Sequence, residues 1–387
     1  MNISDIRALT PIVNEYAYFQ TSGFSPTLEP VIDEVERWAR YQNRAPALPE
    51  VYAQIINLFE AARGKVAKAL GADADEIVLG ENATIGINIV AHGIDWQPGD
   101  NLILSTHEHP GNRIPWYNFI QRYGVQLRFV KVVDDQEQML HEFEQRIDAR
   151  TRLASVSHVS RRTGQRLPVK ALTEIAHQRQ VPVLLDGAQS FGAIPVDVHA
   201  LGCDFYAFSG HKYIMAPQGT GGLYVRRDRI EWLQPSWIGS HSQKDMDLDG
   251  HMTLLDEAKR FEFGTRNLAD QIGFGKALDI WAEIGWANVY AAIAAYTDRL
   301  KAALLTVPNL ILETPLPYEQ SSGIVTFNMP GIDGAALSAS LLNHDHIVAS
   351  TLEANSGSLR ISTHVFNNDE EIDRLVSALL RIQESGY

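Results

Sequence analysis

Residues 181–212 read VPVLLDGAQSFGAIPVDVHALGCDFYAFSGHK and contain two apolar runs that are each followed by polar side chains. The runs VPVLLD (181–186) and FYAFS (205–209) are typical of buried strands in a parallel sheet. The polar side chains at or just after their ends are Asp186, Gln189, Ser209, His211 and Lys212. Ligands of open α/β sheets bind beyond the carboxyl ends of the strands. We therefore expect these side chains to face one site.

Further strand-like runs surround this stretch and alternate with helical patterns. The expected strands are 101–105, 125–132, 152–157 and an added strand at 221–227, and the expected helices are 28–41, 51–70 and 168–180. Apolar residues in 51–70 recur at helical spacing, and Gly71 stands where such a helix would end. Apolar strands that alternate with helices predict an α/β fold whose mostly parallel sheet is covered on both faces.

The pattern changes after about residue 270, where long helices are expected at 271–285, 287–306 and 369–384. Between them the segments ILETP, GIVTFNM and SLRIST predict a small sheet. These features indicate a second, smaller α/β domain. We therefore divide the chain into a large domain of residues 16–260 and a small domain of residues 1–15 and 261–387. The stretch 235–262 is expected to be a loop that joins the two.

The composition of the 387 residues argues against several classes of partner. With 33 Lys+Arg and 47 Asp+Glu the formal charge is −14, which disfavours binding to nucleic acids and to anionic lipid surfaces. The single cysteine, Cys203, cannot form an intrachain disulfide, which favours a reducing compartment. The sequence shows neither a signal-peptide pattern nor an apolar run long enough to span a bilayer, so we expect a cytoplasmic protein.

The motifs DGAQS and FSGHK together resemble the pyridoxal-phosphate (PLP) site of fold type I enzymes. The resemblance is to the class V aminotransferase and cysteine desulfurase superfamily, and it covers most of the chain from Tyr18 to Leu380. It implies an aspartate aminotransferase-like fold, in which a large PLP-binding domain with a seven-stranded sheet carries a smaller C-terminal α/β domain. It also implies PLP as the cofactor and a small amino acid as the substrate.

The resemblance assigns cofactor roles to several residues. Lys212 would hold PLP covalently and move protons, while Asp186 would keep the pyridine nitrogen protonated because an opposite charge favours the charged form. Gln189 would contact the phenolic oxygen of PLP. His109, in STHEHPGNRIPW, would stack on the cofactor ring. The phosphate would bind at the start of a helix within GENATIGINIV (80–90), and its expected ligands are Ala83, Thr84, Ser209 and His211.

Other positions match the substrate side of the family's site. Arg360, in SLRIST, corresponds to the arginine that clamps an amino-acid carboxylate, which a guanidinium binds through two parallel N–H donors. Gly23 lies in YFQTSGFSP, which resembles the pocket entrance of members without a catalytic cysteine. Relatives often carry Asn where Arg161 stands. Arg161 or Arg162 would either face a second acidic group on the substrate or point to solvent, and the sequence leaves both readings open.

The segment FEFGTRN (261–267) resembles a loop that crosses the dimer interface in this family and touches the partner's phosphate. Gly264 and Thr265 are the matching positions, so the resemblance implies a homodimer. The alternative is a simple turn between the two domains.

Two further features concern metals and sulfur chemistry. His107 and His109 have no clear third ligand, so we expect no metal site. Desulfurases that form a persulfide on the protein need a cysteine on a loop before the substrate arginine, and the interval 347–360, IVASTLEANSGSLR, contains none. Cys203 precedes a buried strand and lacks an adjacent His or Lys to lower its pKa, so we expect an inert core thiol.

The sequence therefore predicts a PLP-dependent enzyme that removes the α-proton of an amino acid. Cleavage of a C–S bond by β-elimination, without a cysteine nucleophile, is favoured because lyase-like relatives share the short cysteine-free loop. Transamination and racemisation or epimerisation stay open as outcomes of the same first step. The competing class is an inactive binding protein with the PLP fold, and the presence of both Lys212 and Asp186 argues against it.

Overall fold

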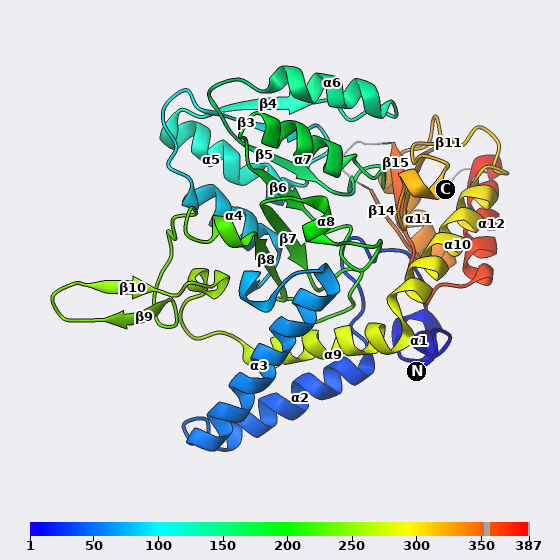
Figure 1. Cartoon of the computed structure of the whole chain (residues 1–387). Coiled ribbons are helices and arrows are strands. Elements are labelled where there is room, and N and C mark those ends of the chain that lie inside the picture. Colours follow the sequence, from blue (N-terminus) through cyan, green and yellow to red (C-terminus); the bar gives the residue numbers. More distant parts are fainter. Residues whose placement is uncertain (352–356, 386–387) are drawn as a thin grey trace.

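A computed structural model describes residues 1–351 and 357–385 of the chain. A seven-stranded sheet lies at its centre, with the strands in the order β2-β8-β7-β6-β5-β3-β4 (Figure 1). Their bounds are β2 (Ile77–Gly80), β3 (Asn101–Ser105), β4 (Gln126–Val130), β5 (Thr151–Ser157), β6 (Val183–Asp186), β7 (Phe205–Ser209) and β8 (Gly221–Val225). Strands β3 to β7 pair in parallel, whereas β8 is antiparallel to both of its neighbours. The predicted α/β fold with a mostly parallel sheet is confirmed.

Successive residues of the central strands alternate between two hydrophobic cores, as the pleat of a strand requires. In β3, Ile103 joins one core, while Leu102 and Leu104 join the other. The first core packs against α2 (Glu29–Arg44), α3 (Pro49–Leu70), α6 (Gln136–Arg146), α7 (Val169–Gln178), α8 (Val198–Leu201) and α9 (Leu268–Ile284). The second packs against α4 (Ala83–Gly93) and α5 (Ile114–Tyr123). Both faces of the sheet are therefore covered, which explains why its strands are apolar on both sides.

A second, four-stranded sheet has its own core. Its order is β11-β12-β15-β14, with the bounds β11 (Ile311–Leu312), β12 (Ile324–Asn328), β14 (Ser350–Thr351) and β15 (Ser358–Ser362). The helices α10 (Trp286–Leu304), α11 (Gly334–Asp345) and α12 (Asp369–Ser385) lie beside it in Figure 1. Near the N-terminus, β1 (Ala17–Tyr18) pairs in parallel with β13 (Ile347–Val348), and Gln20 forms a bridge to Ser362 of β15. The chain start is thus tied to this small sheet.

Packing is continuous across residue 261. α9 shares the first core with α3, and Val13, just beyond the short helix α1 (Asp5–Ala8), belongs to it as well. α2, α3 and α9 lie together on one side of the molecule in Figure 1. The division of the chain into residues 16–260 and the remainder stays a prediction.

The stretch 235–262 differs from the expected loop, because it forms a hairpin of β9 (Gln243–Met246) and β10 (Met252–Leu254). The hairpin projects from the side of the molecule opposite α12 (Figure 1). Its strands, QKDM and MTL, are too short for an alternating pattern to identify them in the sequence. Among the residues with described positions, no helix is long and apolar enough to cross a membrane.

Candidate active site

A cavity of about 350 Å³ opens at the carboxyl ends of the central strands. Most of the residues predicted for the site line it, namely Gly23, Ala83, Thr84, His109, Arg161, Asp186, Gln189, Ser209, His211, Lys212 and Arg360. They come from seven stretches of sequence that only the folded chain brings together. The same wall includes Ser22, Phe24, Asn82 and Ala188, which the sequence analysis did not single out.

The sheet register sets Asp186 and Lys212 at this edge. β6 and β7 run in parallel with Asp186 opposite Ala207, so both strands end side by side. Gly187 then donates its backbone N–H to the carbonyl of Ala207 at 2.7 Å. A Cβ at Gly187 would stand 2.1 Å from Cε1 of Tyr206, so only glycine allows the chain to turn this closely after β6.

Asp186 and Lys212 are both buried, and the charge of each one shifts the pKa of the other. Burial raises the pKa of the Asp186 carboxyl, while Lys212 and the backbone N–H of Ala188, 2.9 Å from its Oδ1, act in the opposite direction. Burial also lowers the pKa of Lys212 to about 8, against the pull of Asp186 and with the help of the cationic Arg360 and Arg161. A large fraction of the Lys212 amine is therefore neutral at mildly alkaline pH and can act as a nucleophile or base.

The amino end of α4 fits a phosphate group. Asn82 caps the helix by accepting the N–H of Ile85 at 3.1 Å, and the N–H of Ala83 points to Oγ of Ser209 at 3.1 Å. Nδ1 of His211 is buried and has no hydrogen-bond partner among the described residues. Helix N–H groups, a hydroxyl and an unsatisfied imidazole nitrogen at one place suit an anion. Asn82 could have been found from the preference for Asn directly before a helix.

His109 is held as a neutral ring. Burial lowers its pKa to about 3, and the charges of Lys212, Arg161, Arg360 and Arg113 act in the same direction. Nδ1 accepts the backbone N–H of Gly111 at 2.9 Å, so the remaining proton belongs on Nε2. A neutral, oriented imidazole on the cavity wall suits the predicted stacking on an aromatic ring.

Gln189 has one side-chain atom left for the predicted contact with the phenolic oxygen. Its Nε2 donates to the carbonyl of Ser22 at 2.9 Å, and its buried Oε1 has no partner among the described residues. The unused atom is therefore an acceptor, which suits a protonated phenol but not an ionised one. Arg161 lines the same wall, and its guanidinium carries N–H donors.

Arg360 lies in β15 of the small sheet and reaches the cavity with 7% of its surface exposed. Its contacts are weak and neutral, at 3.3 Å to Oε1 of Gln20, Oγ of Ser350 and the carbonyl of Arg161. Its Nε is buried without a partner among the described residues. Burial, with the nearby charge of Arg161, lowers its pKa to about 10. A buried guanidinium without a carboxylate among its described contacts is suited to bind an anion.

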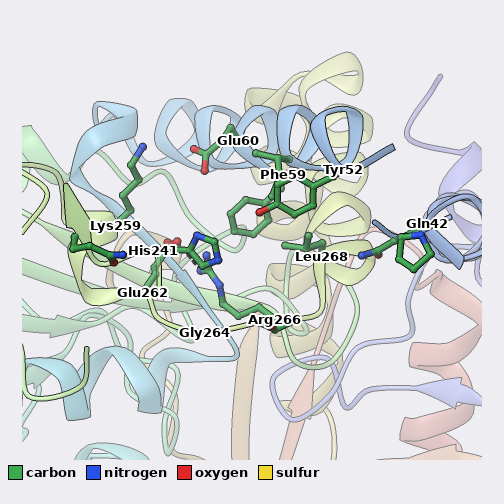
Figure 2. Close-up of a pocket in the computed structure, with 14 residues that line it drawn as sticks. Gln42, Tyr52, Phe59, Glu60, His241, Lys259, Glu262, Gly264, Arg266 and Leu268 are labelled. Atoms are coloured by element: carbon green, nitrogen blue, oxygen red, sulfur yellow. Dashed lines mark ion pairs between the residues drawn. The ribbon is translucent and has the colours of Figure 1, made fainter. Parts of the chain in front are cut away.

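Three predicted residues do not line this cavity. Arg162 is exposed. Burial lowers the pKa of His107, and the charge of Arg162 acts in the same direction. Gly264 and Thr265 line a separate hollow of about 510 Å³ beside α3 (Figure 2). If Thr265 binds a cofactor phosphate, that phosphate must belong to another copy of the chain.

Two further features concern metal binding and the chemistry of the single thiol. The parts described in the structure contain no cluster of three or more His, Cys, Asp or Glu that could hold a metal ion. Cys203 is fully buried, and burial together with the charge of Asp204 raises the pKa of its thiol. Residues 352–356 of the cysteine-free interval 347–360 lie outside the described residues.

Comparison with known proteins agrees with this geometry. The family model "Aminotransferase class-V" matches residues 17–375. A probable cysteine desulfurase of Methanothermobacter thermautotrophicus is 32% identical, with 100% of this chain and 99% of the relative aligned. A cysteine desulfurase of Pectobacterium atrosepticum is 34% identical over 95% of this chain and 93% of its own length. The solved structure of the cystine C–S lyase C-DES with its product cysteine persulfide has a TM-score of 0.89 and 28% identity, over 96% of this chain and 99% of that one.

Proposed function

The chain belongs to the aminotransferase class-V family and is a PLP-dependent enzyme, and we propose that it cleaves the C–S bond of cysteine or cystine by β-elimination. The observation that carries this proposal is the convergence of Lys212, Asp186 and Arg360 on one cavity that no cysteine lines. The similarity to a cystine C–S lyase points to the same reaction.

Each group of residues has a distinct task in this proposal. When bound, PLP withdraws electrons from the α-carbon of the substrate. Arg360 binds the α-carboxylate through two N–H donors, which places the α-hydrogen near Lys212. Lys212 holds the cofactor and then accepts the α-proton as a neutral amine. Asp186 keeps the pyridine nitrogen charged, and the start of α4, with Ser209 and His211, holds the phosphate.

The sulfur leaves without attack by a protein thiol. Loss of the α-proton is followed by departure of sulfur from the β-carbon with the bonding electron pair. With water, cysteine would yield pyruvate, ammonia and hydrogen sulfide, and cystine would yield pyruvate, ammonia and cysteine persulfide. Cys203 takes no part, because its thiol is buried and its raised pKa keeps it protonated.

We further propose that the active unit is a homodimer in the cytoplasm. Thr265 does not line the cavity of its own chain, and its loop carries the exposed Phe263, which stacks on the exposed Trp237 at 6.0 Å between ring centroids. Exposed aromatic pairs beside a functional loop are typical of interfaces. A lone, buried thiol is compatible with a reducing compartment.

A product assay tests the reaction. The holoenzyme is given L-cysteine or L-cystine, alone and with a keto acid, and we expect sulfide or persulfide together with an equal amount of pyruvate. Lys212→Ala should abolish both this turnover and the absorbance of the lysine-bound cofactor. A new amino acid would instead indicate transamination, and inversion of the substrate would indicate an epimerase; either outcome contradicts the lyase proposal.

A further inference from the structure

Glu262 sits at the centre of a buried group of charges next to the Thr265 loop. Its side chain is 2% exposed, and its two oxygens accept hydrogen bonds from Nη1 and Nη2 of Arg63 at 2.5 and 3.0 Å. Nη1 of Arg266 lies 2.6 Å from the same carboxylate. The backbone N–H of Leu79 also donates to it at 2.6 Å. One carboxylate thus joins α3, β2 and the loop that starts at its own residue.

The loop beyond Glu262 has few other anchors. Gly264 adopts a positive φ of 69° and donates its N–H to Ser240 at 3.0 Å. Oγ of Ser242 donates to the carbonyl of Glu262 at 2.7 Å. Thr265 follows between these anchors and Arg266 and lines the same hollow, in which Figure 2 labels its neighbours Gly264 and Arg266. Arg266, the next residue, ties the loop back to the protein through its ion pair with Glu262, a longer hydrogen bond to the carbonyl of Leu79 and a contact with the Phe59 ring.

Within this group of charges, Glu262 is the residue that joins the two arginines. Arg63 is 3% exposed and is also bonded to Glu60, whose side chain is 41% exposed at the rim. Glu60 forms its ion pair with Arg63 alone among the described residues, whereas Glu262 contacts both guanidinium groups. A buried carboxylate that holds two arginines fixes backbone position far better than a surface ion pair.

We propose that Glu262 is a positioning residue that holds Thr265 in place for the cofactor phosphate of the partner subunit. The proposal rests on the homodimer of the proposed function. It predicts an effect in trans: loss of Glu262 in one subunit weakens the cofactor site of the other subunit. A purely structural role would weaken the site of the subunit that carries the change, because β2 leads through Leu79 to the start of α4 of the same chain.

Mixed dimers separate the two roles. Two chains with different affinity tags are co-expressed and the mixed dimer is purified, with Lys212→Ala marking the subunit whose site cannot hold the cofactor covalently. In one mixed dimer Glu262→Gln is placed on the Lys212→Ala chain, and in the other on the chain with Lys212. The readout is the dissociation constant of PLP at the remaining lysine-bound site, measured from its absorbance.

We expect about tenfold weaker PLP binding only when Glu262→Gln is on the Lys212→Ala chain, as loss of one charge-assisted hydrogen bond to the phosphate implies. Glu60→Gln in the same arrangement is the matched control and should leave PLP binding unchanged in both mixed dimers. If Glu262→Gln does not fold, Arg266→Gln, at 21% side-chain exposure, loosens the loop while leaving the Arg63–Glu262 pair intact.

A defect confined to the subunit that carries the substitution, or equal PLP binding in the two mixed dimers, would overturn the role of Glu262. A chain that sediments as an active monomer would instead overturn the proposed homodimer, and the two failures are therefore distinguishable.

Discussion

Lys212 is the residue whose environment departs furthest from that of a surface lysine, because burial and two arginines act against its charge. The neutral amine is the form that reacts with an aldehyde, and it is scarce below the pKa. With the pKa lowered from 10.5 to about 8, we expect covalent loading of the apoenzyme with PLP to accelerate up to about pH 8 and level off above it. Stopped-flow absorbance across pH 6.5 to 10 measures this, because that range extends both below and above the midpoint.

The same experiment on Arg161→Asn provides a check, since removal of a nearby cation should move the midpoint to higher pH. A loading rate that still rises tenfold per pH unit near the ordinary lysine value would contradict the assigned environment of Lys212.

Arg161 is the second arginine on the wall of the cavity. It lines the cavity beside Arg360, so we predict that it binds a second acidic group on the substrate. Arg161→Asn should raise the KM of a substrate with two acidic groups, such as cystine, about tenfold or more, as loss of a hydrogen bond to a charged group implies. The KM of cysteine is the internal control and should stay nearly constant. If only the absorbance pH profile of the bound cofactor changes, Arg161 serves the cofactor instead.

Cys203 is the only thiol of the chain, and its buried surroundings argue against a catalytic role. Its Sγ lies 4.0 Å from the carbonyl of Val198 in the core. We predict that Cys203→Ala keeps most of the turnover and loses about 1–2 kcal/mol of unfolding free energy, as a small core truncation does. Urea unfolding and sulfide release measure the two effects. A variant that folds and binds PLP but releases no sulfur would make Cys203 catalytic.

At the scale of one element, α4 must approach the sheet closely for its first turn to reach the cavity. A Cβ at Gly86 would stand 2.9 Å from the carbonyl oxygen of Gly222 and 3.1 Å from Cβ of Leu223. We predict that Gly86→Ala pushes α4 away from β8, lowers stability by about 1–3 kcal/mol and weakens PLP binding. Thermal unfolding of apoenzyme and holoenzyme separates these effects.

Gly64 in α3 is the matched control, because nothing lies within 4 Å of an added Cβ there. Gly64→Ala should gain roughly 0.5–1 kcal/mol from helix propensity and leave PLP binding unchanged. If the two variants have equal stability and bind PLP equally, the close approach of α4 to the sheet does not contribute to the phosphate site.

At the scale of the whole molecule, exposed aromatic side chains gather near the hairpin and the Thr265 loop. Trp237 is 58% exposed and Phe263 42% exposed. We predict that Trp237→Glu raises the dissociation constant of the dimer about 30-fold or more, as loss of an aromatic anchor does. Sedimentation equilibrium measures this constant. Leu305→Glu changes an equally exposed residue after α10 and should leave it unchanged; similar effects of both would contradict this interface.

The local pattern of the chain determined the main sheet and the residues at its edge. Strands 101–105 and 205–209 match β3 and β7, because buried parallel strands are continuously apolar and hydrophobic burial is the largest local signal. β2, α11 and the β9–β10 hairpin were missed. β2 has four residues and pairs with the distant β8, β9 carries a single apolar residue, and small residues interrupt the apolar pattern of α11.

Tertiary structure alone decided which distant residues share the cavity. Arg161 lines the cavity, whereas its neighbour Arg162 is exposed. The packing of the segment after β5 against the small sheet determines this difference. Arg360 shares the cavity with Lys212 although the two residues come from sheets with separate cores. The same packing directs Nε2 of Gln189 to the carbonyl of Ser22, so that Oε1 has no partner among the described residues. It also leaves Thr265 outside the cavity of its own chain. Such contacts depend on the docking of non-local elements, and no periodicity within one segment encodes them.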